Sequence, residues 1–224
     1  MLVGLVAVVF SLIPLVAQAG NNTITDEVFF DIKVDATEPW TGRIVIGVFG
    51  DALPITSFNF VSLAKGFKHR EELWTYKNCQ VHRIVPDFLI QTGDVVYRDG
   101  RGGRSVYAPY FIDEGFPHSH RAAGYVANAN VGPDSNASQF YITLTKARWL
   151  DNRNVVFGKV IKGLDVVERL AKVQTDANGY PRVPVIITNS GTLSLAEPYD
   201  LTEAELDKGD DIRPGYAAPD FVEL

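Results

Sequence analysis

Cysteine and methionine are scarce in this chain of 224 residues, which contains one of each. Because Cys79 has no second cysteine to pair with, an internal disulfide is excluded. The thiol could still pair with another chain or act in redox chemistry, but an isolated cysteine usually behaves as a small hydrophobic residue. We therefore predict that Cys79 is buried just before a strand.

Clustered positive charge is also lacking. The net charge is −6, and residues 196–224 contain nine acidic residues against two basic ones, so the rest of the chain is close to neutral. Because nucleic-acid binding depends on grouped Lys and Arg, we expect no nucleic-acid partner. We interpret residues 193–224 as an acidic C-terminal tail that is loosely held and solvated, with weak binding of a basic partner or Ca²⁺ as the alternative.

Hydrophobic runs are missing except at the start of the chain. Residues 2–17 carry no charged side chain, and Ala17-Gln18-Ala19 follows as a small-x-small pattern. These features are typical of a signal peptide, which we place at residues 1–19. A short signal anchor is the alternative, but the run falls short of the roughly 20 apolar residues that span a bilayer.

This interpretation places the mature chain in the endoplasmic reticulum lumen or outside the cell, without a membrane span. Two glycosylation sequons are present, Asn21-Asn22-Thr23 and Asn136-Ala137-Ser138. We expect modification at Asn21, which is in the more exposed position.

Alternation of apolar and polar residues predicts a mainly β fold. Residues 28–34 and 43–49 flank a turn-like segment and predict an antiparallel hairpin. Further strands are predicted at residues 81–85, 88–92, 124–128, 140–143, 155–160 and 185–188. Helices are predicted at 54–65 and 163–171. Short strands joined by Gly- and Pro-rich segments predict a barrel or sandwich, and the few charged edges favour a closed barrel capped by the two helices.

Three runs carry the chemistry. The first, Val81–Asp94, predicts two short strands around a Pro-Asp turn. Alternation places Arg83 on one face of the first strand and groups Leu89 with Gln91 on the second. Taken alone, Arg83 is as consistent with a solvated outer face as with a functional site.

The second run, Gly124–Thr143, and the third, Arg148–Val160, surround turn-rich loops. In order along the chain, the elements HRI-P-F--Q-GD, AN-GP--N-SQF and WLD----VFGKV resemble the signature of the cyclophilins. The resemblance covers about residues 26–192. It implies a closed eight-stranded antiparallel barrel capped by two α-helices, and it implies peptidyl-prolyl cis/trans isomerase (rotamase) activity on client proteins.

The resemblance also implies roles for individual residues. Arg83 matches the catalytic arginine, and Gln91 matches the polar group beside it. The remaining matched positions bind substrate: a proline pocket of Phe88, Leu89, Tyr141 and Leu150, a peptide contact at Asn130, a rim of Gln139 and Trp149, and the neighbouring Val131 and Asn154. Trp149 corresponds to the tryptophan associated with cyclosporin binding, so cyclosporin is an expected ligand beside proline-containing clients. We expect a monomer.

The chemistry of an X–Pro bond suits these residue types. Rotation is slow because amide resonance must be broken, which imposes a barrier of about 18–20 kcal/mol. A permanently charged guanidinium such as that of Arg83 can donate a hydrogen bond toward the prolyl nitrogen as its lone pair localises. We therefore expect no nucleophile, no metal and no cofactor.

Four site residues depart from the family pattern. Leu89 stands where methionine is usual, Val131 where alanine is, Tyr141 where phenylalanine is, and Asn154 where histidine is. The change to leucine roughly conserves volume, whereas a tyrosine hydroxyl in an apolar pocket needs a hydrogen-bond partner. We expect Val131 to narrow the neighbouring groove. We predict catalysis that is retained but reduced.

Two other functions remain as alternatives. The first is a luminal chaperone that holds particular clients with weak or no isomerase activity, because the sequence also resembles the branch of the family that escorts visual pigment in insect photoreceptors, without its C-terminal membrane anchor. The second is a metal or hydrolytic site around His82, His118 and His120. The sequence around these histidines offers no convincing third metal ligand and no nucleophile motif.

Overall fold

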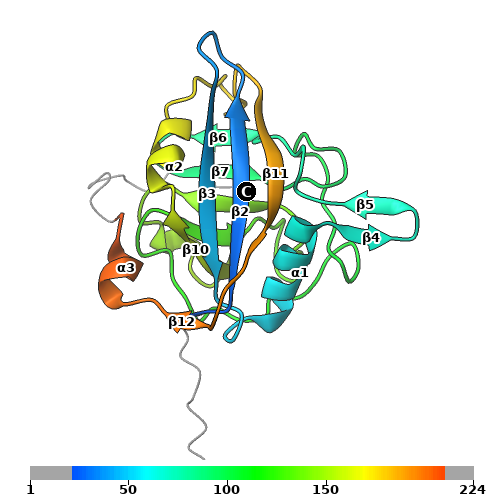
Figure 1. Ribbon diagram of the computed structural model, residues 1–224, viewed down its shortest axis with the longest axis vertical. Coiled ribbons are helices and arrows are strands. Elements are labelled where there is room, and N and C mark those ends of the chain that lie inside the picture. Colours follow the sequence, from blue (N-terminus) through cyan, green and yellow to red (C-terminus); the bar gives the residue numbers. More distant parts are fainter. Residues whose placement is uncertain (1–21, 210–224) are drawn as a thin grey trace, which may run out of the picture.

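Eight strands form one antiparallel sheet in the computed structural model, which describes residues 22–209 (Figure 1). Their order in space is β11-β2-β3-β10-β8-β9-β7-β6. The strands of this sheet are β2 (Asp26–Val34), β3 (Trp40–Val48), β6 (Arg83–Val85), β7 (Leu89–Thr92), β8 (Tyr125–Asn128), β9 (Phe140–Thr143), β10 (Val156–Lys162) and β11 (Val185–Leu193). The other elements are the short strands β1 (Thr23–Ile24), β4 (Phe67–His69), β5 (Glu72–Trp74) and β12 (Tyr199–Asp200), the helices α1 (Pro54–Lys65), α2 (Leu164–Leu170) and α3 (Glu203–Asp207), and the 3-10 turn η1 (Arg148–Leu150).

The predicted hairpin and the two predicted helices are present. Strands β2 and β3 pair antiparallel over their full lengths, from Asp26 opposite Val48 to Val34 opposite Trp40. Helix α1 has the predicted bounds because Pro54 suits the first helical turn and Gly66, with a φ of 92°, ends the helix. Helix α1 packs against β2 and β11, whereas α2 lies against β3 (Figure 1).

The sheet curls without closing, so the prediction of a closed barrel is wrong. The end strands β6 and β11 do not pair as a ladder. Before β6, Gln80 forms an isolated bridge with Ile186. Within β6 itself, the Ile84 N–H donates to Gly179 O at 2.8 Å. A loop that precedes β11 therefore occupies the place beside β6 that β11 would need, and the seam stays open there. The prediction of a mainly β, eight-stranded antiparallel fold is confirmed.

Side-chain alternation divides the apolar residues of the sheet into two clusters. The inner cluster includes Ile90 and Ile142 and packs under α1. The outer cluster includes Leu89 and Tyr141, their sequence neighbours on the same two strands. Because successive residues of a strand point to opposite faces, β7 and β9 contribute to both clusters.

Residues beyond β11 are attached to the body as far as Gly209. Strand β12 pairs with β1, and Thr202 forms a capping box with Glu205 at the start of α3. The guanidinium of Arg121 donates to both Glu203 and Asp207 of α3. The prediction of a loosely held tail is therefore wrong up to Gly209, because some of its acidic residues form ion pairs with the body. The remainder of that tail, like residues 1–19 and Asn21, lies outside the described residues.

Three further sequence features can be compared with the structure. Cys79 is fully buried, as predicted, and burial raises the pKa of its thiol to about 12. Asn136 is also fully buried, and its amide donates to Ile112 O at 3.1 Å, which leaves no room for a glycan in the folded chain. Within residues 22–209, no helix is both long and apolar enough to cross a membrane.

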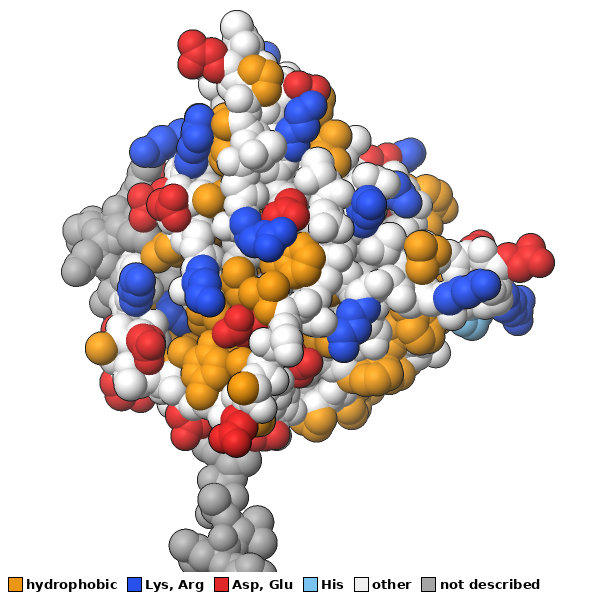
Figure 2. Space-filling view, in the orientation of Figure 1, with side chains coloured by type: hydrophobic (Ala, Val, Ile, Leu, Met, Phe, Trp, Pro, Cys, Tyr) orange, Lys and Arg blue, Asp and Glu red, His pale blue; other side chains and the backbone are white. Residues whose placement is uncertain are grey.

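Surface charges are mixed on the face of the molecule shown in Figure 2, where Lys and Arg are interspersed with Asp and Glu. Hydrophobic side chains are also visible on this face. On helix α1, the side chain of Phe58 is 57% exposed, whereas that of Phe60 is 2% exposed.

Phe60 provides a test of the inner cluster. Its ring lies 5.1 Å from that of Phe140 and 4.7 Å from that of Phe157, measured between centroids. Removal of such a ring leaves a cavity, so Phe60→Ala should lower the free energy of unfolding by about 3–5 kcal/mol in urea titrations. Phe58→Ala is the matched control and should change it by less than about 0.5 kcal/mol. Equal effects of the two substitutions would contradict the assignment of faces on α1.

Candidate active site

Arg83, Gln91 and Tyr141 lie in one row across three neighbouring strands. Arg83 of β6 is directly opposite Gln91 of β7, and Gln91 is directly opposite Tyr141 of β9. Directly opposed residues of antiparallel strands place their side chains on the same face, with Cβ atoms about 4.5–5.5 Å apart. The row therefore lies on the outer face, where Tyr141 belongs to the outer cluster.

The predicted apolar pocket residues gather around this row. Phe88, Leu89, Tyr141 and Leu150 are all members of the outer cluster, and Trp149 packs against it. The rings of Phe88 and Trp149 are 5.6 Å apart between centroids. The structure thus brings together residues that are up to 62 positions apart in the chain, from Phe88 to Leu150.

Two local turns present these side chains. Asp87 has a φ of 65°, and the Phe88 N–H donates to Val85 O at 3.0 Å, which closes a tight turn between β6 and β7. The 3-10 turn η1 carries Trp149 and Leu150 and is closed by the bond from Leu150 N to Ala147 O. The two turns bring the rings of Phe88 and Trp149 into contact beside the outer cluster.

The polar side of the site is a chain of two side-chain amides. Gln91 Nε2 donates to Gln139 Oε1 at 2.9 Å, and Gln139 Nε2 donates to Gly100 O at 2.9 Å and also to Gly102 O. Gly100 has a φ of +96°, and a Cβ there would lie 2.4 Å from the ring of His82. The glycine-containing segment therefore packs closely enough to fix the orientation of both amides.

Asp94 organises this glycine-containing segment. Its buried carboxylate accepts hydrogen bonds from the backbone N–H groups of Val96, Tyr97, Gly100 and Gly102. Burial alone would raise the pKa of Asp94, but these four bonds outweigh burial and lower it. The segment from residue 94 to residue 102 is thus an ordered support for Gln139.

A groove of about 240 Å³ adjoins the row. Its lining includes the predicted catalytic residue Gln91 and the predicted binding residues Asn130, Val131 and Gln139, together with Arg101 and Tyr110. Val131 is 80% exposed, so its side chain stands at the mouth of the groove. Asn130 is anchored through its Nδ2 to Arg153 O at 2.8 Å. Asn154 is not among the lining residues, because its amide is buried and donates to Asn128 O at 2.9 Å.

The hydroxyl of Tyr141 has the partner that the sequence required, and that partner is His120. Tyr141 Oη lies 2.8 Å from His120 Nε2, and His120 Nδ1 lies 2.8 Å from Asp151 Oδ1. Burial raises the pKa of Tyr141 well above its usual value. Sequence reasoning missed this contact; the only signal was His120 itself, which was considered for a metal site. His118 instead stacks on Phe49 with centroids 4.0 Å apart.

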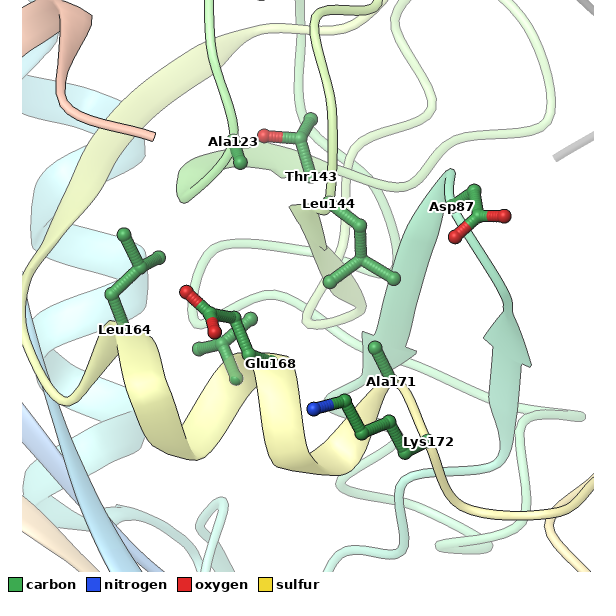
Figure 3. A pocket seen from close by; sticks show the side chains of 9 residues that line it. Asp87, Ala123, Thr143, Leu144, Leu164, Glu168, Ala171 and Lys172 are labelled. Carbon is green, nitrogen blue, oxygen red and sulfur yellow. The ribbon is translucent and has the colours of Figure 1, made fainter. Parts of the chain in front are cut away.

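A second cavity, of about 170 Å³, lies beside α2 (Figure 3). Ala123, Leu144, Leu164, Val167 and Ala171 provide apolar lining, with Thr143, Asp87, Glu168 and Lys172 completing it. None of the predicted site residues lines this cavity. Among the described residues, no group of three or more His, Cys, Asp or Glu side chains is placed to hold a metal ion.

The fold and the site together define a β protein in which an arginine lies beside a buried apolar cluster and a groove of about 240 Å³. The chain belongs to the cyclophilin-type peptidyl-prolyl cis-trans isomerase family, whose family model, described as "Cyclophilin type peptidyl-prolyl cis-trans isomerase/CLD", matches residues 29–192. The resemblance inferred from the three sequence runs is thus confirmed, and the chain is a peptidyl-prolyl cis-trans isomerase.

Three relatives illustrate the degree of similarity. The chain is 43% identical over 176 residues to peptidyl-prolyl cis-trans isomerase CYP21-1 of Arabidopsis thaliana, with 77% of this chain and 78% of the relative covered. It is 41% identical over 179 residues to the rhodopsin-specific isozyme of Calliphora vicina, with 80% of this chain and 74% of the relative covered. It is 40% identical over 186 residues to peptidyl-prolyl cis-trans isomerase D of Saccharomyces cerevisiae, with 83% of this chain and 80% of the relative covered.

Asp94→Asn tests the support of the site. An amide oxygen cannot replace a carboxylate toward four N–H groups, so we expect a loss of about 1–3 kcal/mol in the free energy of unfolding. Because the pKa of Asp94 is lowered in the folded state, its stabilisation is present above the unfolded value near 3.8 and is lost as pH falls through the folded value.

Hydrogen exchange locates this effect. In Asp94→Asn, the four amides that donate to the carboxylate should exchange faster, and the acid dependence of stability should flatten. The more exposed Asp99 on the same segment provides the control, and Asp99→Asn should leave those four amides protected. Unchanged exchange in Asp94→Asn would show that the segment is ordered by other contacts.

Proposed function

We propose that the chain accelerates X–Pro rotation in proline-containing client proteins of the secretory pathway, with Arg83 as the catalytic donor. The single observation that carries this proposal is the row of Arg83, Gln91 and Tyr141, which places Arg83 on the same face of the sheet as the buried outer cluster. A prolyl ring seated on that cluster would bring its nitrogen within reach of the arginine.

The catalytic effect of Arg83 is electrostatic. In the planar amide the nitrogen lone pair is delocalised, and in the twisted transition state it localises and can accept a hydrogen bond. The guanidinium carries its N–H groups in both states, but the nitrogen can accept a hydrogen bond only in the twisted one, so the interaction lowers the barrier without stabilising the ground state equally. The charge is constant because Arg does not deprotonate in proteins.

Gln91 assists by its fixed orientation. Its Nε2 is used by Gln139, so its Oε1 faces the other way. This buried oxygen has no hydrogen-bond partner among residues 22–209. It is therefore available to accept from the Arg83 guanidinium or from a peptide N–H, and it would hold the donor or the substrate in place.

The remaining residues bind the peptide. Phe88, Leu89, Tyr141 and Leu150 provide the apolar surface for the prolyl ring, and Trp149 provides its rim. The groove would hold the part of the substrate peptide next to the proline, and its lining includes Asn130, Val131 and Gln139. Cyclosporin would occupy the same pocket and groove, contact Trp149, and compete with peptide.

The secretory location of the clients is supported by residues 1–19, which have the hydrophobic and cleavage regions of a signal peptide. We further propose that the mature protein acts as a monomer in the endoplasmic reticulum lumen or after secretion, with Asn21 glycosylated. The alternative of a non-catalytic holder of clients has no observation in its favour.

Arg83→Ala provides the test of the catalytic role. Loss of a preorganised donor should reduce kcat/KM for an Ala-Pro reporter peptide by about 100- to 1000-fold, measured by protease-coupled turnover of the mature chain. Arg83→Lys keeps the charge but loses the planar fork, so it should retain more activity than alanine. Turnover unchanged in Arg83→Ala would remove Arg83 from the mechanism, and cyclosporin should inhibit the unmodified chain in the same assay.

Expression of the full chain in a eukaryotic host tests the location. Cleavage after Ala19 should give a product that begins at Gly20, as determined by N-terminal sequencing of the purified protein. A glycosidase that removes N-linked glycans should reduce its mass if Asn21 is modified. Recovery of a chain that retains residues 1–19 would contradict the signal-peptide interpretation.

A further inference from the structure

Three side chains form a buried hydrogen-bonded relay beneath the proposed proline pocket. Tyr141 and His120 are both fully buried, and their ring planes are inclined by only 14° with centroids 5.9 Å apart. The nearly parallel rings meet through the 2.8 Å contact between Tyr141 Oη and His120 Nε2. On the other side of the imidazole, Nδ1 lies 2.8 Å from Asp151 Oδ1.

The partners of His120 determine its tautomer. An ionised carboxylate can only accept, so Nδ1 must carry the proton that faces Asp151. Nε2 then carries no proton, and its lone pair accepts a hydrogen bond from the Tyr141 hydroxyl. The same Oδ1 of Asp151 also accepts from the backbone N–H of His120 at 2.8 Å, which fixes the carboxylate. Burial would raise the pKa of Asp151, but the bonds from His120 outweigh burial and keep it low.

We propose that neutral His120 is a positioning residue that holds the Tyr141 ring as the floor of the proline pocket, so that substrate affinity depends on the protonation state of His120. This inference rests on the proposed function, since it concerns the same pocket. Tyr141 is fixed at two points: its backbone lies in β9 opposite Gln91, and its hydroxyl is held by His120. Movement of the ring would therefore change the surface available to a prolyl ring beside Arg83.

Protonation of His120 reverses the direction of the contact. Nε2 then carries a hydrogen and donates to Tyr141 Oη, and the hydroxyl proton must find another acceptor. His120 is the one hydrogen-bond partner recorded for that hydroxyl within the described part of the chain. The charged and titratable groups that face this imidazole are Asp151 and Tyr141, with Arg148 acting on Asp151 and Arg121 next in sequence but bound to α3.

The two opposing influences on His120 explain why the neutral form is present near neutral pH. Burial lowers the pKa of His120, and the hydrogen bond and charge of Asp151 only partly offset burial. Neutral imidazole, and with it the accepting Nε2, is therefore maintained above that lowered pKa and lost as pH falls through it.

The test compares KM and kcat at two pH values by NMR exchange spectroscopy of a proline peptide, which avoids a coupling protease. As pH is lowered from about 7.5 through the lowered pKa of His120, KM of the unmodified mature chain should rise, by about tenfold once His120 is protonated, with little change in kcat. The change should fall on KM because the relay holds the pocket and the donor Arg83 does not titrate.

Three variants assign the titration. In Tyr141→Phe and in His120→Gln the ratio of the two KM values should fall to about one, since the first removes the hydroxyl and the second removes the titrating group. His69→Gln, on the exposed β4–β5 hairpin, should keep the ratio of the unmodified chain. An acid rise in KM that persists in Tyr141→Phe would overturn the proposal and point to His82, whose pKa is also lowered by burial.

A second readout separates this inference from the proposed function. If turnover is absent, the dissociation constant of the peptide from chemical-shift titration at the two pH values tests the relay in the same way. Nitrogen-15 spectra of the histidine rings should show His120 as the Nδ1–H tautomer at neutral pH. A chain that neither binds the peptide nor shows this tautomer would contradict the relay itself.

Discussion

Strict alternation of side chains along β7 and β9 is the constraint on which the rest of the structure depends. These two strands are buried on both faces, so successive residues must pack alternately into the inner and the outer cluster. Ile90 and Ile142 pack into the inner cluster with the aromatic residues under α1, and Leu89 and Tyr141 build the outer cluster. A shift of register by one residue would exchange the two sets, so the stability of the core and the position of the site are determined together.

Much of the fold could be predicted because it is encoded locally. Helix α1 has its predicted bounds, since Pro54 and Gly66 mark them directly in the sequence. The open seam could not be predicted, because it depends on which distant segment lies beside β6, and Gly179 takes that place through its bond to Ile84. Docking of α3 was missed for the same reason: acidic residues were interpreted as solvated, and their partner Arg121 lies more than 80 positions away.

The site shows the same division between local and distant information. The positions of Phe88, Gln91 and Leu150 follow from short sequence runs whose order is characteristic of the family. The supports of these residues were not predictable, because they are made by contacts across loops. Asp94 accepts hydrogen bonds from four backbone N–H groups of the segment that follows it. His120 lies in the loop that precedes β8 and meets Tyr141 of β9, 21 positions further along the chain.

The central claim is that the outer face of the β6–β7–β9 part of the sheet is the surface that binds and turns over an X–Pro bond. A crystal structure of the mature chain with a bound Ala-Pro peptide tests it most directly. The account predicts the prolyl ring against Phe88, Tyr141 and Leu150, with the Arg83 guanidinium directed at the prolyl nitrogen. A peptide bound in the cavity beside α2, or a prolyl ring remote from Arg83, would contradict it.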